Sequence, residues 1–281
     1  MKFHLLFAFL LLFSLGKAGN DNLPVGARSA GLAHASLALN DAWAVQNNQA
    51  SLAYLEQFSG GVYYENRFLI KDMNLSAAAF ALPTKSGTFG LLYHSFSLSS
   101  YNESKAGISY GRKITENFAV GIGINYNSIR FGGIYGKGHT LTGEIGFRLA
   151  LNKNLVASAH MYNITRSKLN TSNSGSEYIP SIMRFGLNYS ISKKIFAALE
   201  AQKDVDHPLI IRAGAEYRVL DLIAIRAGIS TNPTLNSFGF GFYFKDLVLD
   251  IAASYHQTLG FSPQVGLSYA PSKKKEKEIE P

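Results

Sequence analysis

The chain has no cysteine among its 281 residues, and charged residues make up only 16% of it. The lack of cysteine excludes disulfide bonds, thiolate metal sites and a lipid anchor on an N-terminal cysteine. After residue 15, no segment approaches the roughly 18 uninterrupted apolar residues that a membrane-spanning helix needs. The sequence therefore predicts neither a helical membrane protein nor a disulfide-stabilised one.

Acidic residues are the scarcer charges, which leaves a net charge of +8. Most of the positive residues are scattered, with one dense group at Lys273, Lys274, Lys275 and Lys277. No nucleic-acid-binding motif accompanies this charge, so we expect no nucleic acid partner.

What the chain has in abundance is a pattern of period two between Phe58 and Ala270. Segments of about ten residues alternate apolar side chains with small or polar ones, as membrane-spanning β-strands do. Three segments show it well, with apolar members Phe118, Val120, Ile122, Ile124 and Tyr126; Met183, Phe185, Leu187 and Tyr189; and Phe238, Phe240, Phe242 and Phe244. We expect these side chains to face lipid and the small or amide residues between them, such as Asn125 and Gly239, to face a polar lumen that tolerates substitution.

A soluble β-sandwich would also alternate, so the connections must distinguish the two folds. Fourteen strand candidates are joined alternately by tight turns and by connections that are generally longer and more polar. The tight turns are Pro83–Gly87, Lys113–Asn117, Leu151–Asn154, Ser190–Lys194, Arg218–Asp221 and Phe244–Asp246. The other connections are Ser97–Asn102, Arg130–Gly138, Thr165–Pro180, Lys203–Pro208, Ser230–Ser237 and His256–Pro263, of which Thr165–Pro180 is the longest and is expected to be flexible. This alternation is typical of bacterial outer-membrane barrels, which have an even number of strands.

Composition favours the same fold, because 26 glycines, 15 tyrosines and 19 phenylalanines suit a barrel with a lumen and interfacial aromatic residues. We predict an all-β fold, a transmembrane antiparallel β-barrel of about 14 strands with an N-terminal helical hatch segment.

The expected segments run in order along the chain. Residues 1–18 resemble a signal peptide, with Lys2 before an apolar run and small residues near Ala18. Residues 19–57 lack strand alternation and are expected to form short helices inside the barrel as a hatch, with Asp41, Trp43 and Asn48 among its residues. Residues 58–270 form the barrel, and residues 271–281 a charged periplasmic tail. We therefore expect the protein in the cell outer membrane, among its lipids, with both termini in the periplasm.

Ionisable residues within the strands fall on the polar face and are expected to point into the lumen. They are Glu144, Arg148, Arg184, Glu200, Arg212, Glu216, Arg226 and Asp250. Two interpretations stay open: a structural lattice in which acids and bases pair across strands, and a polar constriction that selects solutes. The sequence does not separate them. We also expect Trp43 to lie close to Glu216 or Arg226.

Candidates for catalysis are weak. His160 follows Ser158 on the same strand face, which is a poor arrangement for a base and its nucleophile. The dispersed histidines have no metal-ligand spacing, and Gly132, Gly133, Gly136 and Gly138 lack the Lys and Ser or Thr of a phosphate-binding loop. We expect a protein that is not an enzyme and has no cofactor and no metal.

Three segments near the N-terminus carry a resemblance to a known family: Gly26–Ala33, Ala38–Val45 and Asn48–Ala53. They resemble the start of the PorV/PorQ branch of the FadL-like outer-membrane proteins of Bacteroidetes, although Gln49 and Ser51 stand where that branch usually has Pro and Gly. Later segments, Arg212–Arg218, Ile225–Gly228, Leu249–Ala252 and Leu259–Gly260, are similar to its closing strands.

The resemblance implies a fourteen-stranded barrel with a hatch. It also implies an accessory role in type IX secretion, in which the barrel shuttles or anchors cargo, with secretion-system components or secreted cargo as partners. The alternative is a FadL-type channel for hydrophobic small molecules, with a hydrophobic solute as its partner.

Overall fold

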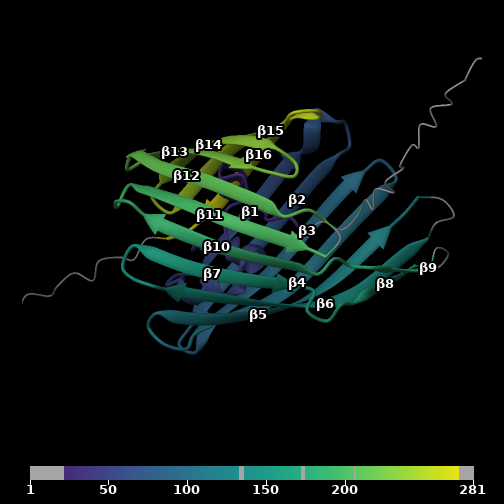
Figure 1. Cartoon of the computed structure of the whole chain (residues 1–281), viewed down its shortest axis with the longest axis horizontal. Helices are drawn as coiled ribbons and strands as arrows, with labels where there is room; N and C mark the ends of the chain where they lie inside the picture. Colours follow the sequence, from purple (N-terminus) through teal and green to yellow (C-terminus); the bar gives the residue numbers. More distant parts are fainter. Residues whose placement is uncertain (1–21, 133–135, 172–174, 206, 272–281) are drawn as a thin grey trace, which may run out of the picture.

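The computed structural model describes residues 22–132, 136–171, 175–205 and 207–271, which form one β-barrel around an N-terminal segment (Figure 1). The predicted signal peptide and all but the first residue of the predicted tail lie outside these residues. The strands are β1 (Ser59–Asn66), β2 (Asn74–Thr84), β3 (Gly87–Leu98), β4 (Tyr101–Lys113), β5 (Phe118–Arg130), β6 (Lys137–Ala150), β7 (Leu155–Tyr162), β8 (Lys168–Thr171), β9 (Gly175–Tyr178), β10 (Ile182–Ser190), β11 (Ile195–Asp204), β12 (Ile210–Leu220), β13 (Ile223–Ser230), β14 (Leu235–Phe244), β15 (Leu247–His256) and β16 (Gly260–Tyr269).

Fourteen of these strands, β1 to β7 and β10 to β16, form a closed antiparallel ring. The ring closes where β1 pairs with β16, from Gly60 opposite Tyr269 to Glu65 opposite Gln264. Strands β8 and β9 form a hairpin outside the ring, attached where Gly138 of β6 pairs with Thr171. The predicted all-β transmembrane barrel of about 14 strands is confirmed.

The two faces of the wall differ as the alternation predicts. In β5, Ile122 and Ile124 are 54% and 63% exposed on the outside, whereas Asn125 is 3% exposed on the inside. Phe185 of β10 and Phe240 of β14 likewise point outward. An outer surface of large apolar side chains favours lipid over water, and the closed ring pairs each of its fourteen strands on both sides, so that the ring has no free edge.

Aromatic side chains cluster on the outer surface near both ends of the barrel. Phe89 contacts Tyr110 at the end where the tight turns lie, with ring centroids 4.9 Å apart, and Tyr255 contacts Phe261 at the other end, at 4.8 Å. Such aromatic groups suit the two interfaces of a membrane.

The tight turns lie at the end of the barrel where β1 begins and β16 finishes, called here the short-turn end; the other is the loop end. At the loop end, two connections are shorter than expected because strand pairing continues into them. Leu98 pairs with Tyr101, and His256 with Gly260. The longest connection is partly ordered, since it contains β8 and β9.

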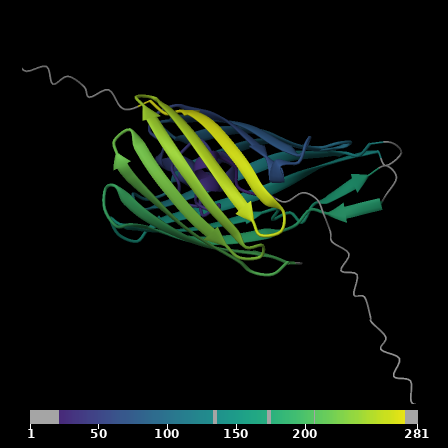
Figure 2. The same cartoon turned by 90° about the horizontal axis from the view of Figure 1, so that it is seen from above.

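Residues 22–57, called the hatch from here on, lie inside the ring of strands, where Figure 2 shows them in purple. The hatch contains α1 (Ala27–Gly31), α2 (Ala44–Asn47) and the 3-10 helix η1 (Gln49–Tyr54), while the short η2 (Arg67–Leu69) joins β1 to β2. None of the helices in the described part of the chain has the length and apolar character required to cross a membrane.

Candidate functional site

The lumen of the barrel is the candidate site, and charged residues tie the hatch to its wall. Arg28 of the hatch donates hydrogen bonds to both carboxylate oxygens of Glu216 in β12, at 2.8 and 2.7 Å. Arg226 of β13 in turn contacts Glu216 at 2.5 Å and Asp250 of β15 at 2.6 Å. Asp41, also in the hatch, lies 3.6 Å from Arg28. This two-pronged contact of an Arg with a carboxylate fixes α1 in orientation as well as in position.

A second group of charges surrounds Glu200 of β11. Its carboxylate accepts hydrogen bonds from the backbone N–H groups of Ser36 and Leu37, at 3.1 and 3.3 Å. Arg184 of β10 lies 2.6 Å from the same carboxylate, and Arg212 of β12 lies 3.3 Å from it. Glu200 thus holds the backbone of the hatch with an acceptor whose charge the wall already balances.

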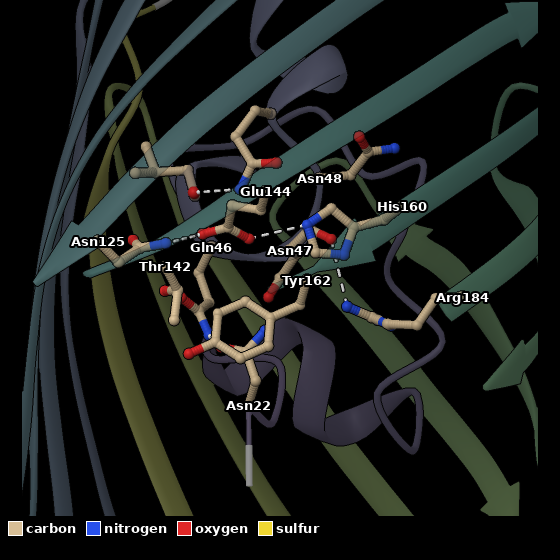
Figure 3. Close-up of polar contacts among 12 residues, drawn as sticks. Asn22, Gln46, Asn47, Asn48, Asn125, Thr142, Glu144, His160, Tyr162 and Arg184 are labelled. Carbon is tan, nitrogen blue, oxygen red and sulfur yellow. Dashed lines mark hydrogen bonds and ion pairs between the residues drawn. The ribbon is translucent and has the colours of Figure 1, made fainter. Parts of the chain in front are cut away.

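The third group is centred on Glu144 of β6, which lies between Asn125 and His160 in Figure 3. The distance from Glu144 to His160 of β7 is 2.9 Å. Lys105 of β4 lies 3.4 Å from Glu144 and donates hydrogen bonds to Asn22 and Gln46, both at 2.9 Å.

The eighth predicted lumen residue, Arg148 of β6, has a different partner. Its guanidinium lies 3.7 Å from the ring centroid of Tyr54, at the end of η1. Nearby, the side-chain amide of Asn48 donates to the carbonyl groups of Leu37, at 2.9 Å, and of Phe147 in β6, at 3.3 Å. Asn48 therefore joins two parts of the hatch to the wall.

All eight ionisable residues predicted for the lumen lie on the inner face of the wall, and each is less than 9% exposed. Seven form ion pairs with one another, with Lys105, with His160 or with the hatch; Arg148 stacks on Tyr54 instead. Within the described residues, the inside of the barrel is thus a set of paired charges around an inserted segment.

Trp43 packs edge-on against Tyr63 of β1, with ring centroids 5.9 Å apart. Its predicted proximity to Glu216 or Arg226 stays a prediction. Trp43 belongs to an apolar cluster in which hatch residues such as Val45 and Leu52 meet Leu75 and Leu92 of the wall. The ring of Trp43 thus packs on the apolar side of the lumen, whereas Arg28 of the hatch contacts the charged residue Glu216.

Burial in the lumen shifts the pKa values of several hatch residues, among them His34 and Asp41. Burial lowers the pKa of His34 to about 3, and the positive charges of Arg212 and Arg184 lower it further by repelling a protonated ring. Burial raises the pKa of the Asp41 carboxyl, and Arg28 opposes this shift. At neutral pH, His34 is therefore neutral in the inserted hatch.

Several residues of the lumen were not predicted from the sequence: Lys105, Arg28, Asn22 and Gln46. Lys105 alternates with outward-facing neighbours in its strand, so the period-two pattern could have placed it on the inner face. Of the weak catalytic pair, His160 contacts Glu144, whereas the Ser158 hydroxyl has no hydrogen-bond partner within the described residues. No nucleophile and base meet there.

Apolar side chains form a second, continuous feature of the lumen, called the apolar track. At the loop end, Ile129, Tyr162 and Ile182 pack together with Leu169 and Ile179, which lie in the connection between β7 and β10. Phe131 and Tyr101 pack against this group, with their rings 5.2 Å apart.

From Tyr101 the track continues toward the hatch. The ring of Phe96 lies 6.4 Å from that of Tyr101, and Phe96 packs against the cluster that contains Trp43. The apolar track therefore joins the mouth at the loop end to the hatch along the β3 to β5 side of the lumen.

Comparisons with solved structures give the fold a precedent. A Pseudomonas aeruginosa FadL homologue superposes with a TM-score of 0.68 at 12% identity, over 88% of this chain and 98% of that one. The Pseudomonas putida toluene transporter TodX superposes with a TM-score of 0.67 at 13% identity, over 89% and 99%. The monoaromatic hydrocarbon channel CymD gives 0.62 at 12%, over 89% and 97%.

The fold is that of the FadL-type barrels. At these identities the likeness concerns the FadL-type fold alone, and no protein-family profile and no curated protein matches the sequence. The segments that carried the resemblance to the PorV/PorQ branch include α1, part of α2 and most of η1, so they build the hatch. Membership of that branch, and of Bacteroidetes, stays a prediction.

Proposed function

We propose that the protein is a non-enzymatic outer-membrane barrel that admits hydrophobic small molecules from the loop end, with the hatch as its internal gate. The observation that carries the proposal is the apolar track. Most inward-facing charges of the wall are paired, so a charged solute would find few unpaired charges among the described residues. A hydrophobic solute, in contrast, would find apolar and aromatic side chains from Ile129 to Trp43.

The FadL-type fold supports this proposal, because the similar structures include a toluene transporter and monoaromatic hydrocarbon channels. The proposal includes an orientation in which the short-turn end faces the periplasm, with both termini there, and the signal peptide is removed near Ala18.

Uptake into proteoliposomes tests the proposal. Vesicles that contain the full-length protein should take up a radiolabelled monoaromatic hydrocarbon faster than empty vesicles, and a labelled sugar no faster. Phe131→Asp places a charge in the loop-end part of the track, beside Tyr101, and should slow hydrocarbon uptake about ten-fold, since an apolar solute gains nothing from a desolvated carboxylate.

Ile114→Asp is the matched control, because Ile114 is 59% exposed in a turn at the short-turn end. It should leave uptake unchanged. Hydrocarbon uptake equal to that of empty vesicles would contradict the proposal, as would equal effects of the two substitutions.

A second candidate is the accessory role in type IX secretion that the sequence resemblance implies. The many contacts between the hatch and the wall favour it, because a barrel that anchors cargo does not need an open lumen. Comparison of the proteins secreted by a strain with and without this barrel distinguishes the candidates. Loss of secreted cargo with unchanged hydrocarbon uptake would support the accessory role.

A further inference from the structure

A groove of about 470 Å³ lies on the outer face of the wall at the loop end, between the connection that follows β7 and the end of β11. Met161 and Met183 form its floor, and Lys203 lies in register with them across β7, β10 and β11, at the rim. Ile164 and Val205 line its sides with apolar side chains, and these residues are 46% and 68% exposed. The groove thus combines an apolar floor with a charged rim.

Two cations line this rim, Lys203 and Arg166. Within the described residues, the guanidinium of Arg166 has neither a hydrogen bond nor an ion pair. Lys203 donates one hydrogen bond, to the carbonyl oxygen of His207 at 2.5 Å, which leaves two of its N–H groups for a ligand. The neighbouring acid, Asp204, also lines the groove; it is 8% exposed, and its carboxylate lies 2.7 Å from His207.

The turn that carries Arg166 is held in place by a buried amide. The side-chain oxygen of Asn163 accepts hydrogen bonds from the Thr165 hydroxyl and the Ser167 N–H, both at 3.0 Å. The amide group of Asn163 donates to the carbonyl of Ile179 at 2.8 Å. Arg166 is therefore presented by a fixed turn, which reduces the entropy that ligand binding would cost.

Below the rim the wall stays apolar. Phe185 of β10, 60% exposed, lies between Ala159 and Ala201 of the adjacent strands. Phe185 therefore has only short side chains opposite it on both neighbouring strands. A ligand that uses the whole groove must therefore carry an anionic group at one end and a hydrocarbon chain at the other.

We propose that this groove binds a phosphorylated membrane lipid, whose phosphate lies between Arg166 and Lys203 and whose acyl chain follows Met183 and Phe185. Arg and Lys are the side chains that pair best with phosphate oxygens. The proposal concerns the lipid-facing side of the wall, so it stands whether or not the lumen conducts a solute.

Native mass spectrometry of the full-length protein in detergent tests the proposal with dihexanoyl phosphatidic acid as the probe. One phosphatidic acid should bind per barrel, about ten-fold more tightly than dihexanoyl phosphatidylcholine. Arg166→Gln and Lys203→Gln should each weaken binding of the phosphatidic acid about ten-fold. Arg166→Lys, which keeps the charge but loses the two-pronged geometry, should fall between.

Lys153→Gln is the matched control, because Lys153 is an exposed cation in a turn at the short-turn end. It should leave binding unchanged, and all variants should keep the heat-modifiable gel migration of a folded barrel. Equal binding of the two lipids would overturn the proposal, as would a loss with Lys153→Gln equal to that with Lys203→Gln. Tight binding of inorganic phosphate alone would also overturn it, since the acyl chain would then play no part.

Discussion

At several positions on the inner wall, the hatch lies so close that no side chain fits. A Cβ atom on Gly228 of β13 would lie 2.4 Å from the backbone of Leu32, and one on Gly121 of β5 would lie 2.2 Å from that of Gln49. Real Cβ atoms do not approach backbone atoms so closely, so the hatch would have to move. Gly143 of β6, in contrast, has its nearest neighbour at 3.5 Å, an ordinary contact.

Gly228→Ala should therefore displace the hatch. In a Ser51→Cys background, whose thiol is the only one in the chain, Gly228→Ala should speed labelling by a water-soluble maleimide about ten-fold, because overpacking typically costs about 1–3 kcal/mol. Ser51 is fully buried in the hatch, so its reactivity reports on hatch displacement. Gly143→Ala is the control and should leave the labelling rate unchanged; similar rates for both variants would mean that the close approach at Gly228 does not hold the hatch.

The same packing corrects one expectation from the sequence. Alternation placed Asn125 and Gly239 correctly on the inside, but the inner face is not a tolerant, hydrated surface there. Asn125 donates a hydrogen bond to Glu144, and a Cβ on Gly239 would lie 3.1 Å from Gly31 of the hatch. Period-two patterning predicts which way a side chain points; it does not predict what a distant segment places opposite it.

His34 should make the inserted hatch sensitive to acid. Its pKa is about 3 when the hatch is inserted, below the ordinary value of about 6.5, so the protonated form favours release. Its contribution is fully present above about pH 6.5 and is lost as the pH falls from there toward 3. The free energy of unfolding in detergent, from urea titration, should fall by up to about 2 kcal/mol between pH 7.5 and pH 5.0.

His34→Asn removes this titration and keeps a group that can bond to Ser29, 3.5 Å from the histidine ring. The variant should lose most of the decrease between the two pH values. An unchanged decrease would assign the acid sensitivity to other groups.

The helices of the hatch contact two different parts of the ring of strands. Helix α1 packs against β13, β14, β15 and β16, whereas η1 packs against β2, β3, β4, β5 and β6. Two of the three charge groups are balanced within the wall, because Glu200 pairs with Arg184 and Arg212, and Glu144 lies near Lys105. In the third group, Glu216 and Asp250 share Arg226 of the wall, and the hatch supplies the second cation, Arg28.

Deletion of residues 22–52 should leave a barrel that inserts into bilayers. Its backbone hydrogen bonds are made between strands, so the ring closes without a plug. Single-barrel conductance should rise well above that of the full chain. A deletion variant that inserts with unchanged conductance would show that the hatch does not limit passage; the Gly143→Ala variant, with its hatch retained, is the baseline.

Strands were predictable because each is a local pattern. The alternation in β5, β10 and β14 gave both the strand and its outer face, and the tight turns followed from short polar sequences. The hairpin of β8 and β9 was not predicted, since it pairs with β6 and lacks a long alternating segment. The pairing of Arg28 with Glu216 spans 188 residues, and no local pattern encodes a contact at that separation.

At the scale of the whole molecule, the apolar outer surface of the barrel favours lipid as its surroundings. Ile124 lies near the middle of β5 and is 63% exposed, whereas Tyr64 lies near the loop end of β1 and is 45% exposed. The two positions have the same orientation and differ in depth.

Ile124→Arg should therefore block assembly, because a charge at the bilayer midplane of a barrel costs about 2–4 kcal/mol. Tyr64→Arg should be tolerated, since that cost falls to about 0–1 kcal/mol near the interface. The measurement is the fraction of protein that is extracted by detergent and shows heat-modifiable migration on a gel. Equal fractions for the two variants would contradict the assigned depth of the membrane.

The pairing of β1 with β16, which closes the ring, also constrains the order of folding. The first and last strands of the ring pair directly, so the ring cannot close until the final strand has been synthesised and delivered. The hatch precedes β1, yet it packs against β16 through α1 and against β4 through η1. The hatch, which is synthesised before any strand of the ring, thus waits for the last strand, and contacts over such long sequence separations make slow folding the expected behaviour. A chaperone that holds the early segment until closure would act on the residues that later become the interior of the barrel.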